Sequence, residues 1–141
     1  APGSRQRQRQ HYHQGAGPVS VTGGLGVETD IGKGNIFVGA AYNWKVRMTE
    51  DGSSTGTPVN VSANAYTLMV RDERGREIFS EASPTFEDGS GTNDVIVFAV
   101  TSADTLGNPP GWYNYAVWQT DSGSEKPVAS GRVYLDVAAH V

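Results

Sequence analysis

The chain has 141 residues, of which 18 are glycine, 7 are proline and 18% are charged, a composition typical of one β-rich domain with many turns. It contains no cysteine, which excludes disulfides and thiolate metal sites. No apolar run approaches the roughly 20 residues of a membrane helix, and the N-terminal residues lack the apolar segment of a secretory signal. We therefore expect a protein that is made in the cytoplasm and has no membrane partner.

The net charge of −4 is divided unevenly along the chain. Residues 1–14 hold three arginines and no acid, whereas the remaining 8 basic and 15 acidic residues give the rest of the chain a charge of −7. Residues 1–17 show no apolar period and cannot bury enough surface to fold alone, which predicts a flexible basic arm. We expect this arm to bind an acidic protein neighbour through Arg5, Arg7, Arg9, His11, Tyr12 and His13. Three cations on an otherwise acidic chain argue against nucleic-acid binding.

The first strands are predicted on either side of residue 41. Residues 18–40 are glycine-rich with short apolar pieces, which favours an extended segment with short edge strands. In the next segment every second residue is large and apolar, with polar residues between them: Tyr42, Trp44, Val46 and Met48. This period of two predicts a half-buried strand. Residues 50–58 are turn formers and predict a loop.

A β-hairpin is predicted in the following segment. Tyr66, Leu68 and Val70 alternate with less apolar residues, and the chain returns over residues 76–80. The intervening residues 72–75 read Asp-Glu-Arg-Gly, a tight turn.

The middle of the chain holds a loop, a strand and one helical turn. Residues 83–93 are rich in Gly, Asp and Ser and predict a polar loop. Residues 95–100 form a continuous apolar run, which predicts a central strand buried on both faces. Residues 101–106 predict one helical turn that is capped by Thr101 or Ser102.

Two more strands close the domain. Residues 112–120 predict an aromatic strand, with Tyr113, Tyr115 and Val117 on one face and Trp112 and Trp118 on the other. Residues 128–137 predict the last strand, and its inward residues are Val133, Leu135 and Val137. We expect Trp112 and Trp118 to be the aromatic side chains that make surface contacts.

Seven or eight short strands at this spacing predict an all-β fold, an antiparallel β-sandwich or jelly-roll-like single domain with an extended N-terminal arm. The predicted organisation is an arm at 1–17, a Gly-rich extended segment with short strands at 18–40 and the β-sandwich domain at 41–141.

No catalytic, cofactor or metal site is predicted. The His11-Tyr12-His13 segment offers no carboxylate or thiol to complete a set of four ligands, so we interpret it as part of the arm. Residues 88–94 place oxygen side chains at alternate positions, as calcium loops do, but lack the distal bidentate Glu. The glycine-rich stretches match no phosphate-binding spacing, and no histidine can be placed beside a nucleophile. We therefore expect a protein that is not an enzyme and holds no cofactor.

Several motifs in order resemble those of small tailed-phage virion proteins. Residues 36–46 lead into an aromatic strand, Asp51-Gly52 follows, then Thr57–Ser62, and then the Tyr-Thr-x-Met-Val-Arg stretch of residues 66–71. The later Pro-Gly-Trp-Tyr-Asn-Tyr of residues 110–115 and Gly131-Arg132-Val133 are similar to the second half of the same pattern. The resemblance covers about residues 34–137 and includes domains similar to the N-terminal part of phage upper-baseplate proteins. Asn60-Val61-Ser62 stands where the pattern has Asp-Leu-Thr, and the loop before Pro58 is longer.

The resemblance implies a virion structural protein, made in the host cytoplasm and located in the virion. The short chain and its arm favour a capsid cement or decoration protein on the capsid surface. Its partners would be the major capsid protein and other copies of itself, as a homo-oligomer. A tail, neck or baseplate adaptor, bound to tail or baseplate proteins, is the alternative. A third alternative is a carbohydrate-binding module on the virion surface that uses exposed Trp and Tyr.

Overall fold

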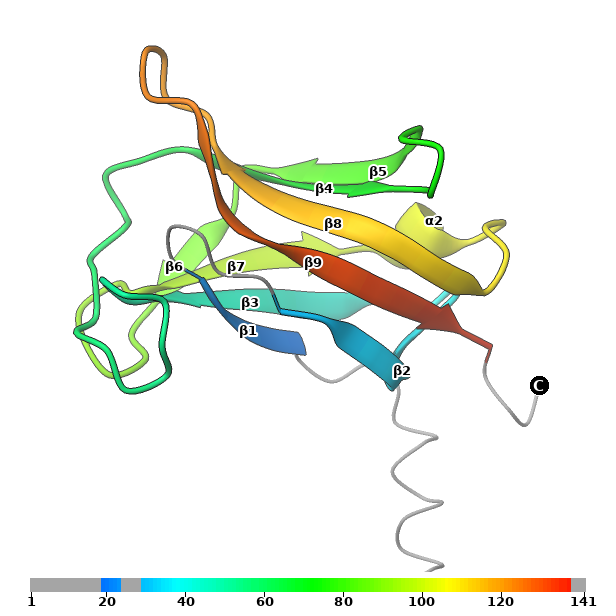
Figure 1. Ribbon diagram of the computed structural model, residues 1–141, viewed down its shortest axis with the longest axis horizontal. Coiled ribbons are helices and arrows are strands. Elements are labelled where there is room, and N and C mark those ends of the chain that lie inside the picture. Colours follow the sequence, from blue (N-terminus) through cyan, green and yellow to red (C-terminus); the bar gives the residue numbers. More distant parts are fainter. Residues whose placement is uncertain (1–18, 24–28, 138–141) are drawn as a thin grey trace, which may run out of the picture.

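The computed structural model describes residues 19–23 and 29–137, which form two β-sheets packed face to face (Figure 1). The four-stranded sheet has the order β1 (Val19–Gly23), β3 (Tyr42–Met48), β7 (Val95–Val100) and β6 (Thr85–Glu87). The five-stranded sheet has the order β2 (Ile31–Phe37), β9 (Lys126–Asp136), β8 (Gly111–Gln119), β4 (Tyr66–Arg71) and β5 (Glu77–Ala82). The predicted all-β sandwich is confirmed, whereas its jelly-roll form is not.

The core lies between the sheets and is built by strand alternation. Every second side chain of β3 and β4 is buried, as the period of two predicted. Trp44 is only 1% exposed, and its ring meets that of Tyr115 from the opposite sheet edge-on, with centroids 5.1 Å apart. This aromatic pair therefore forms a direct packing contact between the two sheets in the core.

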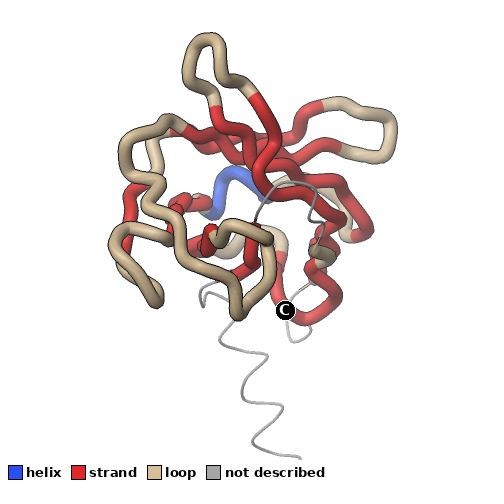
Figure 2. Tube along the Cα trace, turned by 60° about the vertical axis from the view of Figure 1, so that its left-hand side comes forward, coloured by secondary structure: helices blue, strands red, loops and turns tan. Residues whose placement is uncertain are grey.

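Short elements join the strands at the ends of the sandwich, where the loops project in Figure 2. The predicted hairpin is present as β4 and β5. The predicted helical turn is α2 (Ser102–Thr105), which starts after Thr101. The Asp104 carboxylate accepts the Thr101 N–H at 2.9 Å, satisfying one donor at the helix start.

Three local predictions are wrong. The β7 run is not buried along the whole of its outer face, because Val97 is only partly buried and Ala99 is exposed there, whereas Val95 on the same face is buried. Val137 follows the last strand instead of pointing inward, and it is 52% exposed. The predicted loop 83–93 contains β6, because Phe86 finds a packing partner in Tyr66, with ring centroids 6.2 Å apart.

The segment 18–40 contributes an edge strand to each sheet. β1 pairs with β3 and β2 pairs with β9, and both pairs are parallel, whereas the other strand pairs are antiparallel. The antiparallel form of the prediction therefore holds for the centre of each sheet and not for these two edges.

Candidate interaction surface

The outer face of β8 carries the two tryptophans that the sequence singled out. Trp112 and Trp118 are partly exposed, whereas Tyr113, Tyr115 and Val117 are buried. The predicted alternation of the strand is therefore present. The six-residue separation places the two indoles about 20 Å apart at ~3.4 Å per residue, so they do not form one platform.

Trp112 belongs to a row of side chains that crosses three strands. It pairs with Tyr134 of β9, and the rings meet edge-on with centroids 5.2 Å apart. The Arg132 guanidinium lies 4.3 Å from the centroid of the Trp112 ring, and Lys33 Nζ of β2 lies 5.0 Å from that of Tyr134. Asp30 lies 3.4 Å from Arg132 and completes what we call the aromatic–cation row: Lys33, Tyr134, Trp112, Arg132 and Asp30.

Asp30 holds the end of this row in place. Its carboxylate accepts the backbone N–H of Arg132 at 2.9 Å and the guanidinium at 3.4 Å. The backbone hydrogen bond from Arg132 is the main cause that lowers the pKa of Asp30, and the carboxylate stays ionised at neutral pH. Arg132 remains 55% exposed in its side chain, so it is positioned on Trp112 and still accessible to a partner.

Beneath the row, the backbone of Thr29, two residues before β2, is hydrogen-bonded to both β8 and β9. The Tyr115 hydroxyl donates to the Thr29 carbonyl at 2.6 Å, and the Thr29 N–H donates to Ser130 at 2.8 Å. Burial, with a smaller contribution from the Asp30 charge, raises the pKa of Tyr115, so the phenol keeps its proton. Gly131, opposite Tyr115 in the β8–β9 register, leaves space for this approach of Thr29.

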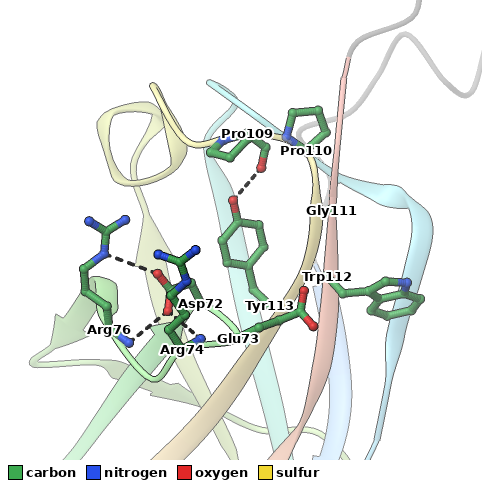
Figure 3. A pocket seen from close by; sticks show the side chains of 9 residues that line it. All are labelled: Asp72, Glu73, Arg74, Arg76, Pro109, Pro110, Gly111, Trp112 and Tyr113. Carbon is green, nitrogen blue, oxygen red and sulfur yellow. Dashed lines mark hydrogen bonds and ion pairs between the residues drawn. The ribbon is translucent and has the colours of Figure 1, made fainter.

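A surface hollow of about 420 Å³ adjoins the row at Trp112 (Figure 3). The Tyr113 hydroxyl donates to the Pro109 carbonyl at 2.5 Å, and Asp72 accepts the N–H groups of Arg74 and Arg76, both at 2.9 Å. Figure 3 shows the Trp112 ring turned to the opposite side of β8 from Tyr113. The hollow and the row therefore share Trp112, but the ring of Trp112 points toward the row and away from the hollow.

This arrangement suits contact with another protein. Trp, Tyr and Arg are the residue types that most often carry the binding energy at protein interfaces. Here the two rings and the guanidinium are held by their neighbours before a partner binds. The entropic cost of ordering these side chains on binding is therefore smaller.

The remaining candidate residues lie in the N-terminal arm and in the loop at residues 88–94. The arm residues Arg5, Arg7, Arg9, His11, Tyr12 and His13 lie outside the described residues. In the loop proposed to resemble a calcium site, Asp94 accepts the Gly89 N–H at 2.6 Å and the Ser90 N–H at 3.1 Å. Asp88 accepts the Asn93 N–H at 2.7 Å. Their carboxylates thus close the loop on its own backbone. Within residues 19–23 and 29–137, no group of three potential metal ligands occurs.

Four members of the row were not predicted from the sequence. Tyr134 and Arg132 alternate with inward Val133 and Leu135, and that alternation was a readable signal for their outward positions. Their proximity to Trp112 depends on the β8–β9 register, and that of Lys33 depends on the parallel β2–β9 pair. A single sequence does not specify either register.

A pair of carboxyl groups, Glu81 on β5 and Asp104 on α2, makes the stability of the fold depend on pH. The hydrogen bond with Asp104, followed by burial and the Asp104 charge, raises the pKa of Glu81 to about 7. Stability from protonated Glu81 is thus fully present below its ordinary pKa of 4.5 and is lost as pH rises through about 7.

We expect Glu81→Gln to raise stability at pH 8 by about 0.5 kcal/mol, or about 2 °C in Tm, because it removes one of two facing charges that solvent partly screens. At pH 5 the variant and the wild type should have the same melting temperature. Thermal unfolding followed by circular dichroism at both pH values measures this difference. An equal gain at both pH values would contradict the explanation.

None of the helices in the part of the chain that the structure describes has the length and apolar character to cross a membrane.

Comparison with known proteins finds structural similarity but no family. No protein-family model and no curated protein matches the sequence. Among solved structures, the N-terminal domain of phage TP901-1 ORF48 is similar, with a TM-score of 0.46 and 8% identity. The match covers 85% of this chain and 98% of that one. A likeness at this level assigns neither a family nor a function to the chain.

Proposed function

We propose that this chain is a structural protein of a phage virion that binds neighbouring virion subunits. The aromatic–cation row is the observation that carries the binding role, because it presents Trp112, Tyr134 and Arg132 on the outer face of a rigid sheet. The ordered motifs that resemble virion proteins support the virion setting.

Within the virion, we propose a capsid cement or decoration protein on the surface of the assembled head, where it forms a symmetric oligomer. The row would contact the major capsid protein, and the basic arm would reach an acidic surface on a neighbouring subunit. A ligand that binds only the assembled shell stabilises that shell by mass action. Two contact elements on one chain add to this effect, because the second contact forms at a high effective concentration.

The motifs behind the resemblance have identifiable structural tasks. Tyr115 and Gly131 meet at the Thr29 carbonyl, and Val133 lies in the core with no exposed area. These residues therefore build the sandwich that presents the row. Because they do not specify a partner, a tail, neck or baseplate adaptor is the second candidate, and it would use the same surface.

A glycan-binding role is less favoured by the geometry. The Arg132 guanidinium covers the Trp112 ring at 4.3 Å, and Tyr134 meets the same ring edge-on. A sugar would have to displace Arg132 or stack on the other side of the ring.

The test is binding of the full chain to phage particles that lack it. We expect wild type to co-sediment with heads, and Trp112→Ala to weaken that binding about 30-fold, the loss typical of a central aromatic contact. Trp118→Ala is the matched control, because it removes the same side chain from the same face of β8. Melting temperatures near wild type for both variants would show that the fold is kept.

The outcomes separate the candidates. Binding to tails in place of heads would favour the adaptor, and a copy number of hundreds per particle would favour the shell. Binding to neither would overturn the virion role, and equal losses for the two tryptophan variants would overturn the assignment of the row. Binding to glycans that is lost in Trp112→Ala would favour the carbohydrate-binding module.

A further inference from the structure

The two sheets leave four edge strands: β1 and β6 in one sheet, and β2 and β5 in the other. An edge strand presents unpaired N–H and C=O groups that can pair with another chain, so proteins usually protect such edges. The devices are charges that point inward, bulges, prolines, and very short strands. The four edges of this sandwich differ sharply in these devices.

The β2 edge is protected by an irregular backbone. Its pairing with β9 shifts register between Ile31 and Ile36, a stretch that contains Gly32 and the exposed Lys33. The Asn35 side chain donates to the carbonyls of Gly32 at 3.1 Å and Lys33 at 3.3 Å, which occupies acceptors that a partner strand would need.

The β5 and β6 edges carry acidic residues. Glu81 of β5 lies opposite buried Leu68 in the register, on the inner face of the sheet, where a charge opposes pairing. β6 has only three residues, and its Glu87 is held by Lys45 at 2.8 Å.

The β1 edge has none of these devices. Its sequence is Val-Ser-Val-Thr-Gly, without charge or proline, and it pairs with β3 in an unbroken register from Val19↔Trp44 to Gly23↔Met48. Within the described residues no strand pairs along its other edge. A regular, uncharged, β-branched edge is suited to the addition of another strand.

We propose that β1 is the surface through which two copies of this chain associate, by antiparallel pairing of their β1 strands about a two-fold axis. The two four-stranded sheets would then form one continuous sheet. In this register Val21 lies opposite Val21 of the second copy and Ser20 lies opposite Thr22, so no like charges meet. This self-complementarity favours a second copy as the occupant over an unrelated strand.

The contact is expected to be weak on its own. A five-residue ladder buries less than the roughly 1,000 Å² of a stable interface, so association should strengthen where copies are held close together. The inference rests on the homo-oligomer included in the proposed function, and it holds for head and tail locations alike.

The test uses charge exchange in the full chain, measured by sedimentation velocity over a range of concentrations. One variant carries Ser20→Lys and Thr22→Lys, and the other carries Ser20→Glu and Thr22→Glu. Each variant alone should raise the dimer dissociation constant about tenfold or more, because like charges face each other across the axis. An equimolar mixture should form heterodimers, because each lysine then meets a glutamate.

The controls keep the result interpretable. Ser20 and Thr22 pair with Lys45 and Arg47 of β3, so the glutamate variant places its charges beside cations and should keep β1 folded. Ser80→Lys, an exposed change on the protected β5 edge, should leave the dimer intact. Dimers that persist in both double variants would overturn the β1 surface while leaving self-association in place. A monomeric wild type, or a mixture that stays monomeric, would overturn the two-fold pairing, whereas binding to particles would still test the virion role.

Discussion

Gly131→Ala is expected to destabilise the protein by about 3 kcal/mol, the upper range for forcing an atom into packed space. A Cβ at this position would lie 2.0 Å from the Thr29 carbonyl oxygen and 2.7 Å from its carbon. These are backbone atoms, so they cannot rotate away as a side chain could. The segment at residues 29–31 would have to leave β9. Urea unfolding measures the loss, and the corresponding fall in Tm is about 10 °C.

Gly32→Ala is the matched control for this prediction. Gly32 lies one strand away, and a Cβ there would meet no atom within 4 Å. We expect a change of no more than about 0.5 kcal/mol, as for an ordinary surface substitution. If both glycine variants unfolded at the same urea concentration, the close approach of Thr29 would not be the reason for glycine at position 131.

Gly131→Ala should also affect the interaction surface. Thr29 is followed by Asp30, which positions Arg132 over Trp112. Displacement of this segment should therefore weaken partner binding even under conditions where Gly131→Ala remains folded.

Asp94→Ala is the second variant with a large expected effect, a loss of about 3 kcal/mol. The Asp94 side chain is completely shielded from solvent, and it accepts the N–H groups of Gly89 and Ser90. Arg47 Nε lies 3.8 Å from the carboxylate and has no other partner among the described residues. Removal of the carboxylate would leave the two buried N–H donors without an acceptor. It would also remove the counter-charge of Arg47, whose guanidinium keeps its hydrogen bond to the Ser90 hydroxyl at 2.6 Å. Thermal and urea unfolding measure the loss.

The ionisation of Asp94 predicts how the stability difference between wild type and Asp94→Ala changes with pH. Burial is the largest single influence and pushes the pKa of Asp94 upward, but the backbone N–H groups of Gly89, Ser90, Asp94 and Gly91 together outweigh it, so the pKa lies below its ordinary value of 3.8. Stability from the ionised carboxylate is present above that ordinary value and is lost as pH falls through the lower folded-state pKa. The gap between wild type and Asp94→Ala should therefore be full at pH 7 and narrow below pH 4. A gap that widens in acid would contradict the role of the carboxylate.

The core was predictable because side-chain periodicity and burial obey the same geometry. Tyr42, Trp44 and Val46 alternate in the sequence and are buried in the structure. The same rule separated Trp112 from Tyr113 on β8. It failed for β7, because a continuous apolar run does not reveal whether a second layer covers the outer face.

The candidate site was only partly predictable. Trp112 was identified by its residue type and its outward position, but Arg132, Lys33 and Asp30 were not connected to it. Lys33 is far from Tyr134 in the chain and reaches it because β2 runs parallel to β9. Nothing in the local sequence distinguishes a parallel from an antiparallel edge strand.

The sequence by itself determined that the chain forms strands and which faces of the alternating strands are buried, because these properties follow from neighbouring residues and a period of two. Only the tertiary structure decided the strand order, the parallel edges, and the meeting of Trp112 with Arg132, Tyr134 and Lys33. These depend on pairings between residues distant in the chain, and many such pairings satisfy the same local pattern. The choice among them rests on the packing of the whole molecule, of which the approach of Thr29 to Gly131 is one part.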